Sequence, residues 1–244
     1  MQERLIAGGP TTDAPADPAG LARAVGRVLD ALREGGIAII PSDLGYGIAA
    51  FTPEAMARSF TAKQRSLDKP CGMYGSPALS RDIHDLPTHV ADLIEAVICE
   101  DGIPFSIVAP LRRDAEGRPS HPMLRATPAA TLPYCTKGGT MDMVLAGGPF
   151  HDALVAACIA RTQPVFGSSA NRSLAGTKYA LDDVEPEVLA AADVLVDAGR
   201  CRYATPLGLS STVIDMRDFA VIRKGHRYDE IKAAFARRAG IVLP

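Results

Sequence analysis

Two stretches of the chain carry residue types that could hold a polyanion. The first is KQRSLDKP at residues 63–70, where Lys63, Arg65 and Lys69 supply three cations. Lys63 and Arg65 are two residues apart, so they point the same way on an extended backbone, whereas a helix would separate them by about 200°. The proline after Lys69 also disfavours helical backbone there. We therefore expect an extended basic lip; the alternative is a solvated surface loop.

The second stretch is GSSAN at residues 167–171, which directly follows an apolar strand-like run. Ser168, Ser169 and Asn171 offer hydroxyl, amide and backbone N–H groups that can hold phosphate oxygens. Arg223 and Lys224, after the last predicted strand, add positive charge. Such a set suits phosphoryl or adenylyl transfer, in which positioning and electrostatic stabilisation carry the reaction. The alternative is a serine-rich turn among scattered surface cations.

A third stretch, PSDLGYG at residues 41–47, follows a short apolar run. Residues 45–50 match the dinucleotide fingerprint G-x-G-x-x-A, but that fingerprint must open a helix. Thr52 and Pro53 are instead the expected cap and first turn of the next helix. We interpret residues 45–50 as a turn in which glycines let the backbone approach a ligand, with Ser42, Asp43 and Tyr46 nearby. The alternative is a plain tight turn without a ligand.

Several familiar catalytic arrangements are missing from the sequence. No Gly-Lys pair occurs, so there is no Walker A loop. Asn171 stands where a nucleophile elbow needs its final glycine. The five histidines show neither H-x-x-x-H nor H-E-x-x-H spacing, and we expect no protein metal site.

The composition is that of an ordinary globular protein, with 47% apolar residues, 22% charged residues and a net charge of −2. This charge argues against binding nucleic acid by bulk charge, although a local basic patch is compatible with it. The five cysteines are far apart and lack a C-x-x-C pair, which indicates buried thiols in a reducing compartment. No apolar run approaches about 18 residues and the start lacks signal-peptide features, so we expect a cytoplasmic protein without a membrane segment.

Helical patterns alternate with short apolar runs along the chain, which predicts an α/β fold. Residues 1–16 are expected to be a loosely ordered leader and residues 17–244 a single domain. The periodicity predicts helices at residues 18–34, from 53 to the basic lip, and at 89–99, 152–161, 181–192 and 228–238. It predicts strands at residues 37–40, 71–74, 105–109, 141–146 and 194–196, and a hairpin-like pair at 211–214 and 219–222. Residues 110–138 are predicted to form a long polar connection.

These segments together resemble the YrdC-like family of threonylcarbamoyl-AMP synthases. IPSDLGYG (40–47) resembles P-T-D-T-x-Y-G-L, KQRSLDKP (63–70) resembles K-x-R-x-x-x-K-P, and SSANRS (168–173) resembles S-x-S-A-N-x-S. SSTVID (210–215) and VIRKG (221–225) resemble P-S-T-V-V-D and I-L-R-x-G. The matches keep the order of the family and cover about residues 20–226. The resemblance implies a twisted open mixed sheet with helices on its faces and a concave basic cavity.

The resemblance also implies an activity. Family members combine L-threonine, bicarbonate and ATP into threonylcarbamoyl-adenylate and release pyrophosphate, which begins a modification of the tRNA anticodon loop. The expected protein is therefore an L-threonylcarbamoyladenylate synthase-like nucleotidyltransferase that uses ATP with Mg²⁺, accepts L-threonine or another small amino acid, and has tRNA-modification partners. The implied catalytic residues are Lys63 and Arg65. The implied nucleotide-binding residues are Lys63, Arg65, Lys69, Ser169, Asn171, Ser211 and Arg223, and the implied amino-acid pocket contains Ser42 and Tyr46.

One departure from the family pattern affects the acceptor side. The family has an arginine after its middle strand, in a V-x-V-R-x-P pattern, whereas this chain has MVLAGGP at residues 143–149 and no Lys or Arg between Lys137 and Arg161. Losing one charge-assisted contact would weaken binding by about 1.5–3 kcal/mol. Arg112, Arg113 or Arg125 in the long connection could replace that cation. The adenylate chemistry is thus better supported than threonine as the substrate.

Two other functions remain open from the sequence. A related branch of the family handles carbamoyl-adenylate, so the protein could transfer a carbamoyl group to another small molecule. A non-catalytic nucleotide- or RNA-binding module on the same scaffold would instead show saturable, salt-sensitive binding without adenylate formation.

Overall fold

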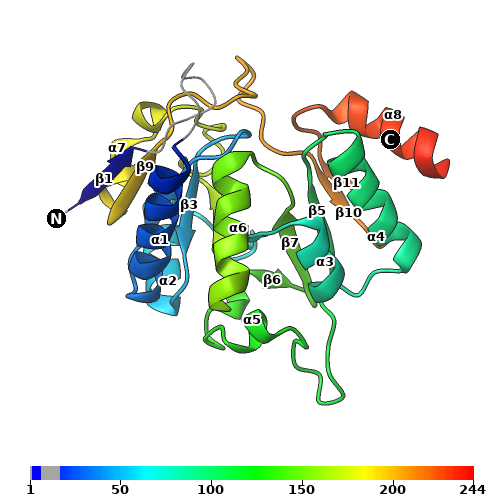
Figure 1. Cartoon of the computed structure of the whole chain (residues 1–244), viewed down its shortest axis with the longest axis horizontal. Helices are drawn as coiled ribbons and strands as arrows, with labels where there is room; N and C mark the ends of the chain where they lie inside the picture. The colour runs from blue at the N-terminus through cyan, green and yellow to red at the C-terminus, as the bar shows by residue number, and fades with distance from the viewer. Residues whose placement is uncertain (1, 7–16) are drawn as a thin grey trace.

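The structure is a computed structural model that describes residues 2–6 and 17–244. One open mixed sheet of eleven strands crosses the described part of the chain (Figure 1). Its order is β1-β9-β2-β3-β8-β4-β7-β5-β10-β11, with the short β6 paired to β7. The strands are β1 (Glu3–Ile6), β2 (Ala38–Ile40), β3 (Gly47–Ala50), β4 (Gly72–Tyr74), β5 (Ser106–Pro110), β6 (Thr136–Lys137), β7 (Thr140–Val144), β8 (Phe166–Ser169), β9 (Val194–Asp197), β10 (Val213–Asp215) and β11 (Val221–Arg223).

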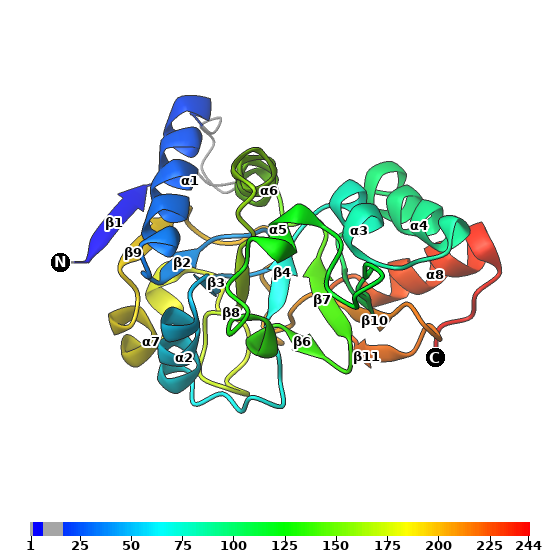
Figure 2. The ribbon, with the colours of Figure 1, turned by 90° about the horizontal axis from the view of Figure 1, so that it is seen from below.

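Helices cover the two faces of the sheet unequally. The helices are α1 (Pro18–Arg33), α2 (Pro53–Ala62), α3 (Pro77–Ile83), α4 (Thr88–Glu95), α5 (Pro122–Arg125), α6 (Pro149–Arg161), α7 (Pro186–Ala190) and α8 (Tyr228–Ala239). Short 3-10 turns lie at Leu132–Tyr134 and Leu181–Asp183, and a π turn at Ala96–Glu100. Figure 2 shows α1, α6, α3 and α4 on one face, while α2 and α7 lie on the other face near the β1 end. Beyond α2 and α7, mainly loops lie over the second face in this view.

The first long helix forms as its sequence predicts. Asp17 caps α1 by accepting hydrogen bonds from the backbone N–H groups of Ala19 and Gly20, and proline takes the first helical position. The apolar side chains at helical spacing are buried against the sheet. Gly35, with φ of +86°, ends the helix as a residue without a Cβ can. The α/β prediction is confirmed.

The segment after residue 45 differs from its prediction. Residues 47–50 form strand β3, fully buried between β2 and β8, and not a continuing turn. The short sequence GIAA has too few residues for a visible alternation, so only its neighbours in the sheet determine its conformation. The same strand confirms that no dinucleotide-binding helix starts here. The next helix begins at Pro53 with Thr52 as its cap, as predicted.

Other predictions require smaller corrections. Part of the expected leader is ordered, since β1 pairs in parallel with β9, whereas residues 1 and 7–16 lie outside the described residues. The expected helix at 181–192 shortens to a 3-10 turn and α7. The hairpin of β10 and β11 is confirmed. Four of the free cysteines are buried as expected, but Cys99 is exposed. No helix within residues 2–6 and 17–244 is long and apolar enough to cross a membrane.

Candidate functional site

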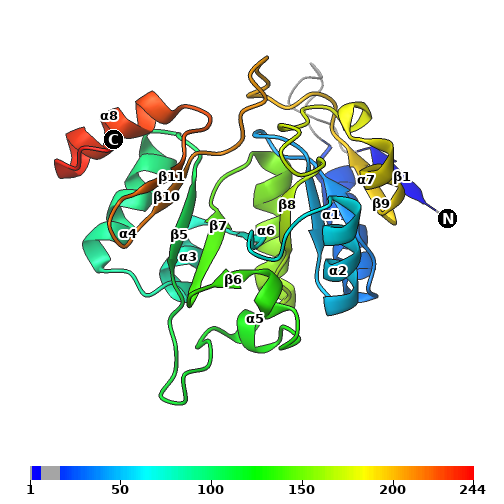
Figure 3. The same ribbon diagram turned by 180° about the vertical axis from the view of Figure 1, so that it is seen from behind.

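The open face of the sheet holds two connected spaces. A large cavity of about 990 Å³ and a small pocket of about 120 Å³ share seven lining residues, and together we call them the hollow. The shared residues are Arg65, Pro70, Asp142, Ser169, Thr177, Ser210 and Arg223. The residues that line the hollow come from the turns that follow α2 and β8 and from the β10–β11 pair. Figure 3 shows where these elements lie in the ribbon. The basic stretch and the serine-rich turn, which the sequence indicates as one set of anion-binding groups, therefore line the same hollow.

The lining of the large cavity is strongly basic. It contains seven cationic side chains and only two carboxylates, although the whole chain has a net charge of −2. The cations are Lys63, Lys69, Lys137, Lys224, Arg65, Arg217 and Arg223, and the carboxylates are Asp142 and Asp215. Arg217 is paired with Asp215 at 2.6 Å. Positive charge is thus concentrated where an anion can enter.

Lys63 does not lie on an extended lip. It is the C-cap of α2 with helical backbone angles, and Gln64 then adopts a positive φ of 51°. Its side chain is only 1% exposed and its Nζ donates to the carbonyl oxygens of Ser169 and, at 2.7 Å, Asn171. Ser173 N–H donates back to the Lys63 carbonyl at 2.9 Å. Burial, with help from nearby Arg65, lowers the pKa of Lys63 to about 7. The lysine therefore holds the turn after β8 in place.

Arg65 and Lys69 remain at the surface of the hollow. The guanidinium of Arg65 donates to the carbonyl oxygens of Lys69 and Pro70, each at 2.7 Å, and lies 5.7 Å from the Phe60 ring centroid. These contacts fix a half-buried cation that lines both the pocket and the cavity. Lys69 is exposed on the wall of the large cavity. The prediction of a basic segment is correct, but a turn rather than extended backbone presents it.

The turn after β8 presents polar atoms that lack protein partners. Ser168 Oγ and Asn171 Oδ1 are buried and have no hydrogen-bond partner among the described residues. Both residues line the hollow, Ser168 in the small pocket and Asn171 in the large cavity. Buried polar groups without partners are rare and costly, so such atoms are expected to meet a ligand or water.

Arg223 and Ser211 form the opposite wall. Arg223 Nε donates to the Ser211 carbonyl at 2.8 Å and its Nη2 donates to Ser211 Oγ at 3.0 Å. Ser106 also donates to Ser211 Oγ at 2.8 Å. Arg223 is thereby held in the hollow at the end of β11, with both residues lining the small pocket. Their predicted contact with a nucleotide stays a prediction.

The two residues expected to contact the amino acid differ in position. Ser42 lines the small pocket, where its hydroxyl donates to Gly45 O at 2.7 Å. Tyr46 also borders the pocket, but its buried hydroxyl donates to Gly199 O at 2.8 Å and accepts from Ala198 N at 3.0 Å. That hydroxyl therefore ties β3 to the loop after β9. We do not assign it a contact with substrate.

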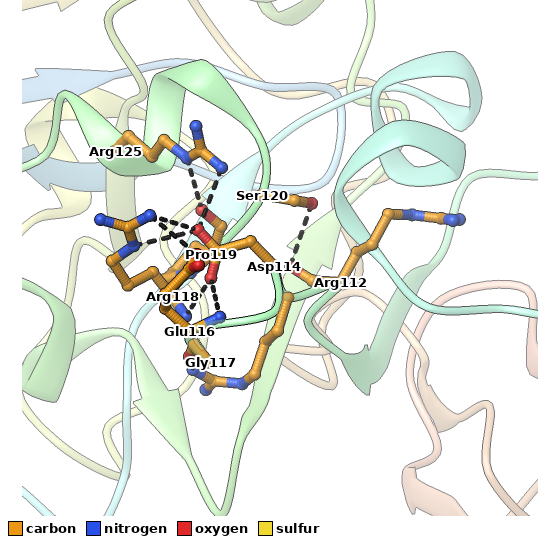
Figure 4. Close-up of polar contacts among 9 residues, drawn as sticks. Arg112, Asp114, Glu116, Gly117, Arg118, Pro119, Ser120 and Arg125 are labelled. Carbon is orange, nitrogen blue, oxygen red and sulfur yellow. Dashed lines mark hydrogen bonds and ion pairs between the residues drawn. The ribbon is translucent and has the colours of Figure 1, made fainter.

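The long connection does not supply the missing cation. Figure 4 shows Arg125 and Arg118 around Asp114, within the connection itself. Arg113 donates to Gly117 O, and Arg112 donates to the carbonyl oxygens of Arg81 and His84. None of Arg112, Arg113 and Arg125 lines the hollow. The hypothesis of a replacement arginine is wrong, because Arg113 and Arg125 bind partners inside the connection and Arg112 binds carbonyl oxygens at the end of α3.

Three glycines line the small pocket on the side formed by the sheet. Gly47, Gly72 and Gly167 belong to neighbouring strands, and Gly72 lies opposite Gly167 in the sheet register. A Cβ at Gly47 would lie 2.0 Å from the Tyr74 hydroxyl oxygen, and one at Gly167 would lie 2.6 Å from Ile48 O. The pocket exists because these positions carry no side chain.

We expect Gly47→Ala to destabilise the protein by about 1–3 kcal/mol, because the added methyl group must displace Tyr74 or the strand. Gly26→Ala on α1 is the matched control, since its Cβ would meet nothing closer than 3.5 Å and alanine favours a helix by about 1 kcal/mol. Urea unfolding of both variants measures the difference. Equal stability of Gly47→Ala and the parent would show that this part of the pocket wall tolerates a side chain.

One residue of the hollow was not found from the sequence. Asp142, in the centre of β7, lines both the small pocket and the large cavity. Burial raises the pKa of Asp142 to about 6, against the opposing effect of Arg223 and Arg65. The available signal was an acidic residue between methionines in a predicted strand, which places its side chain on the face opposite theirs.

The fold and the hollow define an α/β protein with an open mixed sheet and a hollow lined mainly by basic side chains. Residues 30–225 match the Sua5/YciO/YrdC family model, described as telomere recombination. This match covers most of the chain, and the protein belongs to the Sua5/YciO/YrdC family. The resemblance to YrdC-like proteins is thus confirmed.

Solved structures share the fold at low sequence identity. The hypothetical protein smu.1377c from Streptococcus mutans UA159 has a TM-score of 0.77 at 19% identity, covering 100% of this chain and 97% of that one. P. abyssi Sua5, in a structure complexed with L-threonine, has a TM-score of 0.66 at 18% identity, and the match covers 100% of this chain but 62% of Sua5. E. coli YciO has a TM-score of 0.62 at 16% identity, covering 93% and 96%. A search of curated protein sequences found no match.

Proposed function

We propose that this protein is an enzyme that makes a carbamoyl-adenylate from a small amino acid, bicarbonate and ATP and releases pyrophosphate. L-Threonine is the leading acceptor, as in the formation of tRNA threonylcarbamoyladenosine. The observation that carries the proposal is the convergence of the basic turn at 63–70, the polar turn at 168–171 and Arg223 on one hollow. Membership of the Sua5/YciO/YrdC family and the L-threonine complex of P. abyssi Sua5 support it.

Two bond-forming steps are needed, and neither requires a protein nucleophile. The neutral amine attacks the carbon of bicarbonate, giving a carbamate and water. A carbamate oxygen then attacks the α-phosphorus of ATP, which forms the acyl phosphate bond and expels pyrophosphate. The protein must position two anions close together and stabilise the charge on the leaving pyrophosphate.

The residues of the hollow would divide these tasks. Arg65 and Lys69 would bind phosphate oxygens on one wall, and Arg223 would bind from the opposite wall. Lys63 would act indirectly by holding the turn that carries Ser169 and Asn171. Magnesium would enter with ATP as part of the substrate; within the described residues no group of three or more His, Cys, Asp or Glu side chains could hold a metal ion.

Incubation of the purified protein with ATP, bicarbonate and L-threonine tests the proposal directly. We expect pyrophosphate release and a new adenylate, detected by mass, only when all three substrates are present. A product formed from carbamoyl phosphate, with another acceptor, would indicate the carbamoyltransferase alternative instead. Saturable binding of ATP or RNA, with no pyrophosphate released from ATP whichever amino acid is added, would contradict the synthase proposal. That result would favour the non-catalytic binding module.

A further inference from the structure

Asp142 is a carboxylate that the protein does not satisfy. It lies in β7 opposite Gly72 of β4 and Val108 of β5, on the face of the sheet that forms the hollow. Its Oδ1 is buried and has no hydrogen-bond partner among the described residues. A Cβ at Gly72 would lie only 3.3 Å from the carboxyl carbon, so the glycine leaves the space that the carboxylate occupies.

The charges around Asp142 do not neutralise it by direct contact. Arg65 and Arg223 line the same pocket, but both guanidinium groups donate to other partners, and no ion pair to Asp142 forms within the described part of the chain. Asp215, the other carboxylate of the hollow, is paired with Arg217. An unpaired, partly buried carboxylate costs free energy that a structural role does not repay. Such violations are expected at binding sites.

The surroundings identify the missing partner as a hydrogen-bond donor with positive charge. A carboxylate offers only acceptors, and the nearby Ser168 hydroxyl also lacks a partner. A protonated primary amine supplies three donors and a charge that opposes the carboxylate. The flanking guanidinium groups suit an anionic group a few bonds away on the same molecule.

We infer that Asp142 binds the ammonium group of the substrate in the small pocket and makes the protein selective for small primary amines. This inference deepens the proposed function: the bound ammonium group would give one proton to the Asp142 carboxylate, and the neutral amine that results would be the nitrogen that is carbamoylated. Asp142 then acts as a specificity-determining residue on β7, where the chain carries no cation.

Three related probes, of which 1-aminopropan-2-ol is L-threonine without its carboxylate carbon, separate the contributions of the amine and the carboxylate. L-Threonine carries both groups, 1-aminopropan-2-ol carries only the amine, and 2,3-dihydroxybutanoate carries a hydroxyl in place of the amine. Calorimetric titration of wild type and Asp142→Asn with each probe gives the comparison. We expect Asp142→Asn to weaken both amine-bearing probes about tenfold or more and to leave 2,3-dihydroxybutanoate unchanged or tighter.

Two controls distinguish binding from structural damage. Asp142→Asn should raise the melting temperature of the free protein, because it removes an unpaired carboxylate, whereas a structural role would lower it. Asp142→Ser should lose amine binding in the same way. Asp152→Asn, exposed on α6 at the other face of the sheet, should bind all probes as the wild type does.

The inference and the proposed function can fail separately. Unchanged L-threonine affinity in Asp142→Asn, or failure of both amine-bearing probes to bind the wild type, would overturn the inference. Pyrophosphate release from ATP is measured in the same samples. If amine binding depends on Asp142 but no pyrophosphate is released, the inference stands and the synthase does not.

Discussion

Replacing Arg65 by alanine is expected to slow pyrophosphate release from ATP about 10- to 150-fold. One charge-assisted hydrogen bond contributes about 1.5–3 kcal/mol, and each 1.4 kcal/mol or so corresponds to a factor of ten. Arg65 lines both the small pocket and the large cavity, so under the proposed function its loss would affect the nucleotide and the carbamate together. Arg65→Lys should give an intermediate rate, because an ammonium group cannot reproduce the planar fork that holds two carbonyl oxygens.

The control for this charge removal is Arg237→Ala. Arg237 lies on α8, paired with Asp101 at 2.9 Å and away from the hollow, so its loss should leave the rate unchanged. Steady-state rates over a range of ATP concentrations, with unfolding curves for each variant, provide the measurement. An Arg65→Ala variant that folds normally and turns over at the parental rate would remove Arg65 from the site.

The second large effect is expected at Lys63. Lys63→Met keeps the length of the side chain but removes the donor to the Ser169 and Asn171 carbonyl oxygens. We expect the turn after β8 to lose its fixed geometry and adenylate formation to fall by about tenfold or more, since small misplacements of binding groups are costly. Lys69→Met removes an exposed lysine from the same segment, and its effect on the unfolding free energy should be small.

The stability effect of Lys63→Met should depend on pH. Burial lowers the pKa of Lys63 to about 7 in the folded protein, whereas the pKa of lysine in an unfolded chain is about 10.4. Between these values the unfolded state binds a proton that the folded state has released, so the contribution of Lys63 to the unfolding free energy rises with pH. This gain in unfolding free energy is lost again as the pH falls towards 7.

The measurable quantity is the difference between parent and variant. Buried thiols such as Cys158, whose pKa burial raises to about 12, titrate with the opposite sign in the same range and, having no interaction with Lys63, cancel in this difference. We expect the stability advantage of the parent over Lys63→Met to grow from pH 7.5 to 9.5, by at most about 1.4 kcal/mol per pH unit. A difference that is flat in pH would show that Lys63 stays charged in the fold.

The local patterns predicted most helices because those patterns are short-range. A cap and an apolar stripe suffice for α1, and a Thr-Pro start suffices for α2. The position of Lys63 could not be derived in this way. Its conformation depends on two carbonyl oxygens more than 100 residues further along the chain, and spacing within residues 63–70 cannot show them.

For a related reason, the sequence did not reveal Asp142 as part of the hollow and wrongly suggested the arginines of the long connection. A carboxylate in a strand could face either side of the sheet, and only the folded structure, in which Asp142 lies opposite Gly72 and lines both spaces, shows that it enters the hollow. The arginines at 112, 113 and 125 were available as charges in the sequence, but Arg113 and Arg125 bind partners within the connection and Arg112 binds the carbonyl oxygens of Arg81 and His84. Composition gives the number of charges, and the fold decides which of them face the site.

The position of β8 in the sheet has a consequence for how the chain acquires its site. β8 lies between β3 and β4 in the sheet. The three glycines that line the small pocket, at positions 47, 167 and 72, therefore come together from distant parts of the sequence. Non-local pairings of this kind form slowly, because the intervening chain must close first. During synthesis, a nascent chain that ends at α6 already carries the cations of residues 63–70. It still lacks Ser169 and Asn171, whose carbonyl oxygens accept hydrogen bonds from Lys63. The site is therefore expected to be among the last parts of the protein to mature.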